Sequence, residues 1–486
     1  MNLPILRPAA ILFAIATMSP TPLPAASAAI KPANEFFAYF GTGRSGANLG
    51  FSVAHFDSDT GALTVPTLAP TAAAPNIFIF SADGSRLYTC HAGRTFQNQP
   101  GGGVSAFAVD PSTGALTLLN STSSGGADPG YVSLDQTGRF LFVANYNGGS
   151  IAVFALQPDG SLGARTFFDQ HTGQSVNPTR QGHAYCEAIF TDATNRFVIS
   201  TDLGLDKIFI YHFDQKTGVL TPGETPFATI APGSGPRHAA FGPGEKFLYV
   251  VGEMTSTLTT YAWDATRGTL TDLQTISTVP EDFKSKNNPA EVLVHANGKF
   301  LYTSNRGHDS LAVFAIDAKT GRLSLVQHIP TGGKTPRCFS FDPTGKWIVV
   351  SNQDTNNATV FRVDAITGKL TQLGEPVSVP SPLQAQFLVA QSNVARLYGP
   401  GTVNPGYYSI GTATTIDDLI KNNLYRQAFL RTIVVTRPKA EGGVETFRGF
   451  RGSDVPNQNG QQNEGQLSGQ FLLKARDTIY VDAEGL

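Results

Sequence analysis

The chain has 486 residues, more than one ordinary domain needs, which predicts at least two folded units. Charged residues make up 15% of it and the formal net charge is -2, so its composition argues against a nucleic-acid partner and against an anionic membrane surface. The 50 glycines and 31 prolines, with 10% aromatic residues, are typical of many short strands joined by tight turns.

The N-terminus has the organisation of an export signal. A positive charge at Arg7 precedes a short apolar run over residues 9–18, and a stretch of small residues follows at 25–29. The apolar run is too short to span a bilayer, and no other run of about 18 apolar residues occurs. We therefore predict a signal peptide over residues 1–29, no membrane span, and a periplasmic or secreted location.

Cysteine is rare in this sequence. The three cysteines, Cys90, Cys186 and Cys338, are too few and too scattered to indicate a disulfide framework. No pair of Cys or His residues has the spacing of metal ligands. We therefore expect buried free thiols, and neither a metal nor a cofactor.

One strand–turn–strand unit recurs along most of the chain. Clear copies begin at Tyr131, His238, Glu291 and Cys338, and weaker copies begin at Ile77 and Ala188. Each copy continues into a third strand and a turn that contains glycine. Those turn glycines, spaced by roughly fifty residues, are Gly61, Gly114, Gly160, Gly218, Gly268, Gly321 and Gly368. A four-stranded antiparallel unit with this period predicts an all-β fold, a seven-bladed β-propeller, with a stacked solenoid as the alternative.

The sequence also indicates how the ring closes. The first unit, residues 36–64, has no preceding inner strand, and a spare strand-like segment at 383–389 follows the seventh unit. We expect this segment to supply the missing strand, because a closed ring leaves no strand edge unpaired. The propeller is therefore predicted over residues 33–391.

Charged residues recur at one end of the predicted blades. The first strand of a blade runs along the channel and the second returns, so the residue before the first and the residue after the second lie at the same rim. By this logic Arg237, Glu253 and Arg306 face one channel mouth. Five further residues are expected there as substrate-binding groups: His238, Glu291, His308, Arg337 and Gln353. The alternative is that each charge is an ordinary solvated or ion-paired loop residue.

Several short segments carry a more specific pattern: Gly-Gly-Gly-Val-Ser-Ala-Phe at 101–107, Asp-Leu-Gly-Leu-Asp at 202–206, Gly-Pro-Arg-His at 235–238, Ser-Asn-Arg-Gly-His-Asp at 304–309 and Thr-Pro-Arg at 335–337. As an ordered set they resemble the 6-phosphogluconolactonase/carboxymuconate-cyclase family of seven-bladed propellers, over about residues 36–390. The resemblance implies ring opening or closing of lactones, with Arg237, Glu253 and Arg306 as catalytic residues. Arginine can stabilise an oxyanion, and a carboxylate can act as a general base.

The sequence departs from this family at the fourth blade. A rim His is usual just before the inner strand there, whereas this chain has Glu187, with His183 four residues earlier. We expect Glu187 or His183 to occupy that part of a substrate site. The resemblance implies a small, anionic lactone as substrate. Because 6-phosphogluconolactone is an intracellular metabolite, the export signal leaves a different sugar lactone open.

The blade pattern stops after residue 391. Val-Asn-Pro-Gly-Tyr-Tyr-Ser-Ile follows at 403–410, then a capped-helix pattern at 414–420 and strand-like segments at 432–436 and 477–481. These segments resemble the soluble-ligand-binding β-grasp domain of polysaccharide-export proteins. The resemblance implies a small α+β domain over 399–486 and a partner in the envelope export machinery. A noncatalytic propeller that binds a glycan or a protein is therefore the alternative to a lactone hydrolase.

Overall fold

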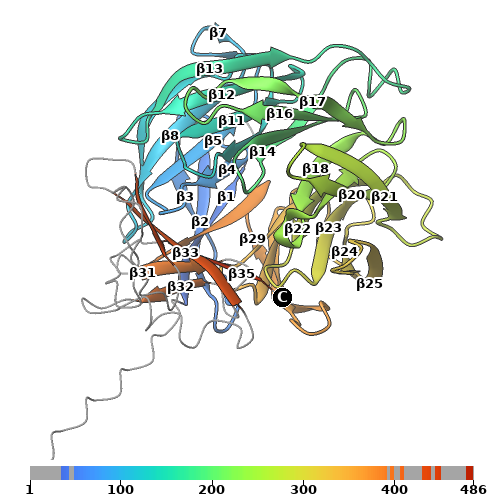
Figure 1. Ribbon diagram of the computed structural model, residues 1–486. Coiled ribbons are helices and arrows are strands. Elements are labelled where there is room, and N and C mark those ends of the chain that lie inside the picture. The colour runs from blue at the N-terminus through green and yellow to red at the C-terminus, as the bar shows by residue number, and fades with distance from the viewer. Residues whose placement is uncertain are drawn as a thin grey trace, which may run out of the picture.

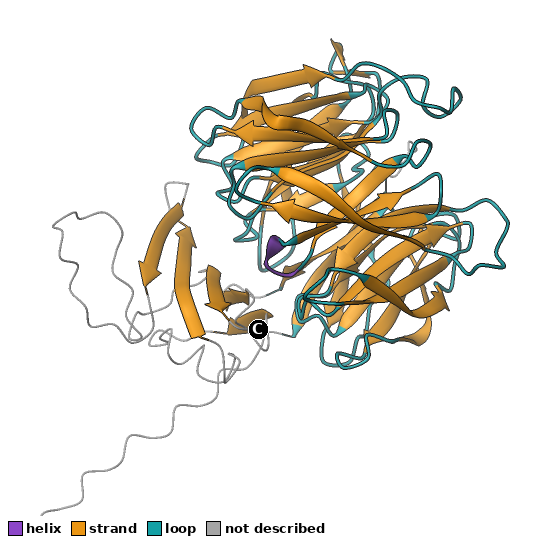
Figure 2. Ribbon diagram, turned by 45° about the vertical axis from the view of Figure 1, so that its right-hand side comes forward, coloured by secondary structure: helices purple, strands orange, loops and turns teal. Residues whose placement is uncertain are grey.

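A computed structural model describes residues 34–42 and 49–390, together with strands at 394–398, 406–409, 429–438, 444–449 and 478–484. Almost every element in this part of the chain is a β-strand, and its one helical element is the short 3-10 turn Pro243–Glu245 (Figure 2). Among the described residues, no helix is long and apolar enough to cross a membrane. The signal peptide predicted over residues 1–29 lies outside them.

Seven four-stranded antiparallel sheets confirm the predicted propeller (Figure 1). Their inner strands contact one another in the cyclic order β4, β10, β14, β18, β22, β26, β30 and back to β4. From the inner strand outward, three sheets are β4 (Phe78–Phe80), β5 (Arg86–His91), β8 (Gly103–Val109), β9 (Leu116–Ser123); β10 (Pro129–Leu134), β11 (Phe140–Asn145), β12 (Ser150–Leu156), β13 (Leu162–Gln170); and β14 (Cys186–Thr191), β15 (Phe197–Asp202), β16 (Lys207–Phe213), β17 (Leu220–Thr229). The next three are β18 (Pro236–Phe241), β19 (Phe247–Gly252), β20 (Thr257–Asp264), β21 (Thr269–Ser277); β22 (Asn288–Val294), β23 (Phe300–Arg306), β24 (Ser310–Ile316), β25 (Leu323–Pro330); and β26 (Pro336–Phe341), β27 (Trp347–Asn352), β28 (Asn357–Val363), β29 (Leu370–Ser378). A small hairpin, β6 (Thr95–Phe96) and β7 (Gln99–Pro100), lies between β5 and β8 in the chain.

The seventh sheet closes the ring as the sequence predicted. Its strands run β3 (Thr67–Pro70), β2 (Gly50–Asp57), β1 (Glu35–Gly41) and β30 (Gln384–Val389). Strand β30 pairs antiparallel with β1, from Phe36 opposite Val389 to Gly41 opposite Gln384. The C-terminal end of the propeller thus supplies the inner strand of its N-terminal blade, so that β1 is paired along both of its edges.

The hydrophobic core lies between neighbouring sheets. All six residues of β11 are buried, because both faces of this strand are covered by adjacent blades. Phe142 on β11 packs in one cluster with Ile189 of β14 and Tyr211 of β16, which belong to the next blade. Apolar residues on both faces of the central strands therefore hold each blade to its neighbours.

The turn glycines are required by conformation and by packing. Gly218 has φ +75°, which side-chain-bearing residues rarely adopt, and a Cβ there would lie 2.3 Å from the ring of Phe140. Gly268 has φ +67° and the same relation to Phe197. Each of these turns therefore lies directly against an aromatic ring of the preceding blade.

The strands described after residue 390 form a separate five-stranded sheet. Its order is β32 (Gly406–Ser409), β31 (Val394–Tyr398), β35 (Thr478–Glu484), β33 (Phe429–Pro438) and β34 (Val444–Gly449). Strands β31 and β35 are parallel, and the other pairs are antiparallel. The predicted strands at 432–436 and 477–481 correspond to β33 and β35. The helix predicted at 414–420 lies outside the described residues, so the β-grasp assignment stays a prediction.

Candidate functional site at one end of the channel

Five inner strands contain one extra residue near their beginning. The register shifts fall at Gly130 in β10, Glu187 in β14, Arg237 and His238 in β18, Ala290 and Glu291 in β22, and Arg337 in β26. A bulge of this kind redirects the side chain of the extra residue and is common beside functional sites. The bulges therefore place charged side chains from several blades at corresponding positions on the channel.

The structure brings together Arg237, Glu253 and Arg306. Oε2 of Glu253 lies 3.0 Å from Nη1 of Arg237 and 2.8 Å from Nη2 of Arg306. The same Nη1 of Arg237 donates a hydrogen bond to Oε1 of Glu187 at 2.7 Å. The side chains of Glu253 and Arg237 are only 5% and 6% exposed, so these ion pairs are largely shielded from water. We refer to Glu187, Arg237, Glu253 and Arg306 as the charge cluster.

The cluster shifts the pKa values of its members. Burial alone would raise the pKa of Glu253, but the charges of Arg306 and Arg237 and a hydrogen bond from Arg180 outweigh it, so the pKa lies well below its ordinary value. Burial lowers the pKa of Arg306 to about 10, and repulsion by Arg237 adds to this effect. Both groups are therefore ionised at neutral pH.

Arg337 adds a cation that the described carboxylates do not pair. Its Nε atom is buried and has no hydrogen-bond partner among the described residues. Burial and the positive charge of Arg237 lower the pKa of Arg337. Among the described residues, Arg180, Arg237 and Arg306 bond to the cluster carboxylates Glu187 and Glu253, and Arg337 is a fourth arginine beside them. Within this group four positive charges face two negative ones, an electrostatic preference for an anion or a developing oxyanion.

A second group of buried ionisable side chains, His238 and Glu291, lies one position further along the inner strands. Nδ1 of His238 is 3.0 Å from Oε1 of Glu291, and both residues are buried. The ring of Tyr131 packs edge-on against His238, with 5.1 Å between ring centroids. Burial raises the pKa of Glu291, but the neighbouring His238 outweighs this and leaves it below the ordinary value. This pair is therefore a buried, ionisable layer beside the charge cluster.

Two of the predicted substrate-binding histidines, His183 and His308, make contacts with residues outside the charge cluster. The ring of His183 is exposed and stacks on Tyr185, and its Nδ1 bonds to the carbonyl of the next residue at 2.7 Å. His308 bonds through Nδ1 to Oγ of Ser310 at 2.6 Å and packs against Phe283. Glu187 bonds directly to Arg237 in the charge cluster, whereas a role of His183 and His308 in substrate binding stays a prediction.

Gly307 lies between Arg306 and His308 in the chain. At φ +120° this glycine turns the chain immediately after Arg306, which ends β23. Gln353 is held by its backbone, whose N–H donates to the carbonyl of Thr335 at 3.0 Å, and its side chain is half-buried.

Two residues of the site were not anticipated from the sequence. Nη2 of Arg180 donates to Oε1 of Glu253 at 2.6 Å, and Arg180 also interacts with the hydroxyl of Tyr146. Burial, reinforced by the charges of Glu187 and Glu253, raises the pKa of Tyr146 to about 12. Arg180 lies in the connection 171–185, which has no strand periodicity. Its unusual length was the only available signal, because long loops in compact domains are often functional.

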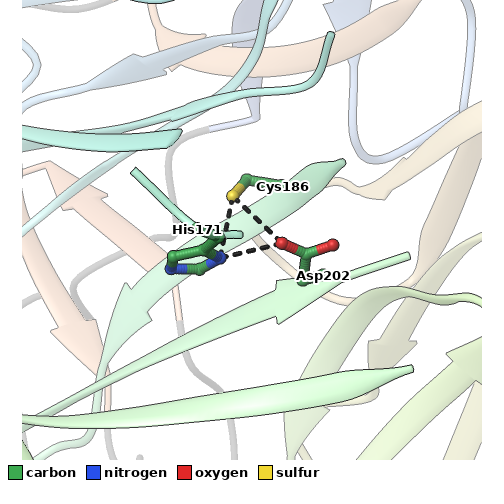
Figure 3. Close-up of side chains that lie close together, drawn as sticks. All are labelled: His171, Cys186 and Asp202. Atoms are coloured by element: carbon green, nitrogen blue, oxygen red, sulfur yellow. Dashed lines mark hydrogen bonds and ion pairs between the residues drawn. The ribbon is translucent and has the colours of Figure 1, made fainter. Parts of the chain in front are cut away.

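The same connection is anchored at both ends by a buried side-chain network, shown in Figure 3. Nδ1 of His171 is 2.8 Å from Oδ2 of Asp202 and 3.2 Å from Sγ of Cys186. Oδ1 of Asp202 accepts a hydrogen bond from the backbone N–H of Tyr185 at 2.8 Å. The network therefore holds the first and last residues of the 171–185 connection.

His171, Cys186 and Asp202 are also a possible ligand set for a metal ion. Zinc ligands stand about 2.0–2.3 Å from the ion, so ligand atoms around it are farther apart than the 2.8 Å between His171 and Asp202. The separation of 2.8 Å is that of a direct hydrogen bond between His171 and Asp202. In this arrangement the ligand atoms are too close to one another to surround a metal ion. Burial, and then the Asp202 charge, raise the pKa of Cys186 well above its ordinary value. The thiol is a buried free thiol, as predicted, like Cys90 and Cys338.

Comparison with known proteins agrees with this architecture. Residues 37–387 match the family described as "Lactonase, 7-bladed beta-propeller". This chain is a member of that lactonase family. A 6-phosphogluconolactonase from Bacillus subtilis is 36% identical over 354 residues, which cover 73% of this chain and 99% of the relative. A 6-phosphogluconolactonase from Formosa agariphila is 31% identical and covers 54% of this chain and 74% of the relative.

A solved structure supports the same assignment. The periplasmic gluconolactonase PpgL of Pseudomonas aeruginosa has a TM-score of 0.68 and 30% sequence identity to this lactonase-family chain, covering 74% of this chain and all of the other. The family match ends at residue 387, so it covers the propeller and not the sheet that follows. The resemblance of the C-terminal segment to β-grasp domains therefore has no support from these comparisons.

Proposed function

We propose that this protein hydrolyses a sugar lactone at the end of the channel that carries the charge cluster. The observation behind the proposal is that Glu253 contacts both Arg237 and Arg306 at 3.0 Å or less, beside the unpaired Arg337. A carboxylate can accept a proton from water, and guanidinium groups can stabilise the oxyanion that water addition creates. Relatives named 6-phosphogluconolactonase and gluconolactonase support a lactone as substrate.

In the proposed reaction Glu253 transfers the proton and the arginines stabilise the negative charge. A water oxygen forms a bond to the lactone carbonyl carbon while Glu253 accepts its proton. The carbonyl oxygen becomes negative next to the arginines, among which Arg337 has an unused buried N–H. When the ring C–O bond breaks, Glu253 returns the proton to the leaving alkoxide. The product is an open-chain hydroxy-acid, whose carboxylate suits a site with an excess of positive charge.

A rate measurement tests this proposal. The full-length protein is offered glucono-δ-lactone and its 6-phosphate, and acid release is followed against the spontaneous rate. We expect hydrolysis that falls strongly in Glu253→Gln and in Arg337→Gln but not in Arg322→Gln, an exposed arginine on the turn before β25. Equal rates in all variants, or no rate above the background, would overturn the proposal and favour a noncatalytic propeller.

Export is proposed from the sequence of residues 1–29, together with the periplasmic relative from Pseudomonas aeruginosa. Fractionation of cells that express the full chain tests it. We expect the protein outside the cytoplasm, with its N-terminus shortened. A cytoplasmic protein that keeps its first residues would contradict the export signal.

A further inference from the structure

Three arginines bind Glu253, and Arg180 differs from the other two. Arg237 has a second carboxylate partner in Glu187 and its side chain is 6% exposed. Arg306 donates through Nε to the carbonyl of Asn288 at 2.9 Å, and its side chain is 15% exposed. The side chain of Arg180 is 34% exposed and comes from a connection rather than from a strand. Arg180 is therefore the guanidinium that leaves Glu253 most easily.

The backbone next to Arg180 is firmly held, so the side chain can move while its loop stays in place. Gln181 is completely buried and donates through Nε2 to the carbonyl of Leu203 at 2.9 Å. On the other side, Ser175 donates through Oγ to Oδ2 of Asp206 at 2.5 Å. Asp206 in turn accepts the backbone N–H of Gly235, just before β18. The loop is thereby fixed to the blade that carries Arg237.

Both oxygens of Glu253 are occupied in this arrangement. Oε2 accepts from Arg237 and Arg306, and Oε1 accepts from Arg180 at 2.6 Å. Among the described residues, the other ionisable groups near Glu253 are Glu187 of the cluster, and then Tyr146, Arg337, Cys338 and the His238–Glu291 pair. A carboxylate whose pKa is held this low is a weak base, since general bases work best with a pKa near the operating pH. Water activation therefore needs one of these contacts to open.

We propose that Arg180 leaves Oε1 of Glu253 when a lactone binds and donates instead to an oxygen of that lactone, which frees Oε1 to accept the proton of the attacking water. Arg180 is in this view a positioning residue that couples substrate binding to the activation of Glu253. This inference rests on the proposed lactonase function. It adds that the bound molecule carries an oxygen acceptor, a hydroxyl or an anionic group, within reach of the 171–185 connection.

The pH dependence of the rate separates this role from a structural one. The acid limb of kcat/KM reports the free protein and the acid limb of kcat reports the substrate complex. In the wild type we expect the kcat limb at higher pH, because Arg180 has left Glu253 in the complex. In Arg180→Gln the acid limb of kcat/KM should shift to higher pH until it coincides with the acid limb of kcat. KM should rise about tenfold or more, because one charge-assisted hydrogen bond is lost. Arg322→Gln should leave both limbs in place. Hydrolysis with coincident limbs in the wild type, or an unmoved limb in Arg180→Gln, would overturn the inference.

A binding experiment keeps this test independent of turnover. Gluconate, an unreactive hydroxy-acid anion, is titrated calorimetrically near pH 5 in two buffers that differ in ionisation enthalpy. We expect net proton uptake on binding by the wild type and much less by Arg180→Gln, in which Glu253 has already lost this contact. Proton uptake without hydrolysis would sink the lactonase proposal alone. Hydrolysis without proton uptake would sink the Arg180 inference alone, and absence of both would sink both.

Discussion

Nη2 of Arg306 lies 2.8 Å from Oε2 of Glu253, although 53 positions separate the two residues in the chain. Glu253 directly follows β19 and Arg306 ends β23, and these are the second strands of neighbouring blades. Because the blades repeat the same path around the channel, residues about one repeat apart end at the same rim. The contact is thus a direct product of the repeat.

Replacing Glu253 by Gln should affect both activity and stability. We expect lactone hydrolysis to fall by about 10²–10⁴-fold, the usual contribution of a general base. Three arginines would also lose their shared carboxylate, which should lower the free energy of unfolding by about 3–5 kcal/mol at neutral pH. The exposed Glu375→Gln on β29 is the matched control. Unchanged stability would contradict the ion-pair geometry described above.

The stabilisation by Glu253 has a defined pH dependence. Its pKa is lower in the folded protein than the ordinary 4.5, so its contribution is full above that value and is lost as the pH falls toward the folded pKa. Denaturation curves of wild type and Glu253→Gln should therefore converge as the pH drops below about 4. A difference between the two that stays constant with pH would contradict this.

Arg337→Gln should have the opposite effect on stability. This arginine has no hydrogen-bond partner for its buried Nε and is repelled by Arg237. Removing its charge should leave the melting temperature unchanged or raise it, while hydrolysis falls. Arg237→Gln, which breaks two carboxylate contacts, should instead destabilise the fold. Thermal unfolding of the two variants distinguishes these expectations, and a loss of stability in Arg337→Gln would contradict them.

A pair of glycine substitutions tests the packing between blades. Gly218 and Gly138 both have positive φ, but a Cβ at Gly218 would meet the ring of Phe140 at 2.3 Å and one at Gly138 would meet nothing within 4 Å. Gly138→Ala should cost about 1 kcal/mol through backbone strain alone. Gly218→Ala should cost about 1–3 kcal/mol more, because the ring must move. Equal losses in chemical denaturation would contradict the close contact.

Glu245 should make the protein less stable as the pH rises through the neutral range. Burial, partly offset by a hydrogen bond from the Ala193 N–H, raises its pKa to about 7. Between its ordinary pKa of 4.5 and this value the folded state binds more protons than the unfolded chain, so stability falls with increasing pH. Glu245→Gln should therefore be more stable than the wild type at pH 8, by about 1 kcal/mol after allowance for partial exposure. If the difference in stability between the wild type and Glu245→Gln were the same at pH 5 and at pH 8, the prediction would be wrong.

The sequence by itself determined the propeller. The repeated strands, the seven turn glycines and the spare strand at 383–389 fix the number of blades and the closure, because these features are local and recur at a constant period. It also indicated that Arg237, Glu253 and Arg306 share one rim, since strand ends follow from the repeat.

Only the tertiary structure decided which side chains complete the site. Arg180 reaches Glu253 from a connection without periodicity, and no local pattern fixes the path of such a loop. The φ of +120° at Gly307, which sets the path of the chain between Arg306 and His308, is likewise not encoded by strand alternation. The pairing of His171, Cys186 and Asp202 likewise depends on contacts between residues 15 and 31 positions apart. Strand periodicity constrains positions along a blade, whereas loops and ion pairs are fixed by the packing of blades against one another.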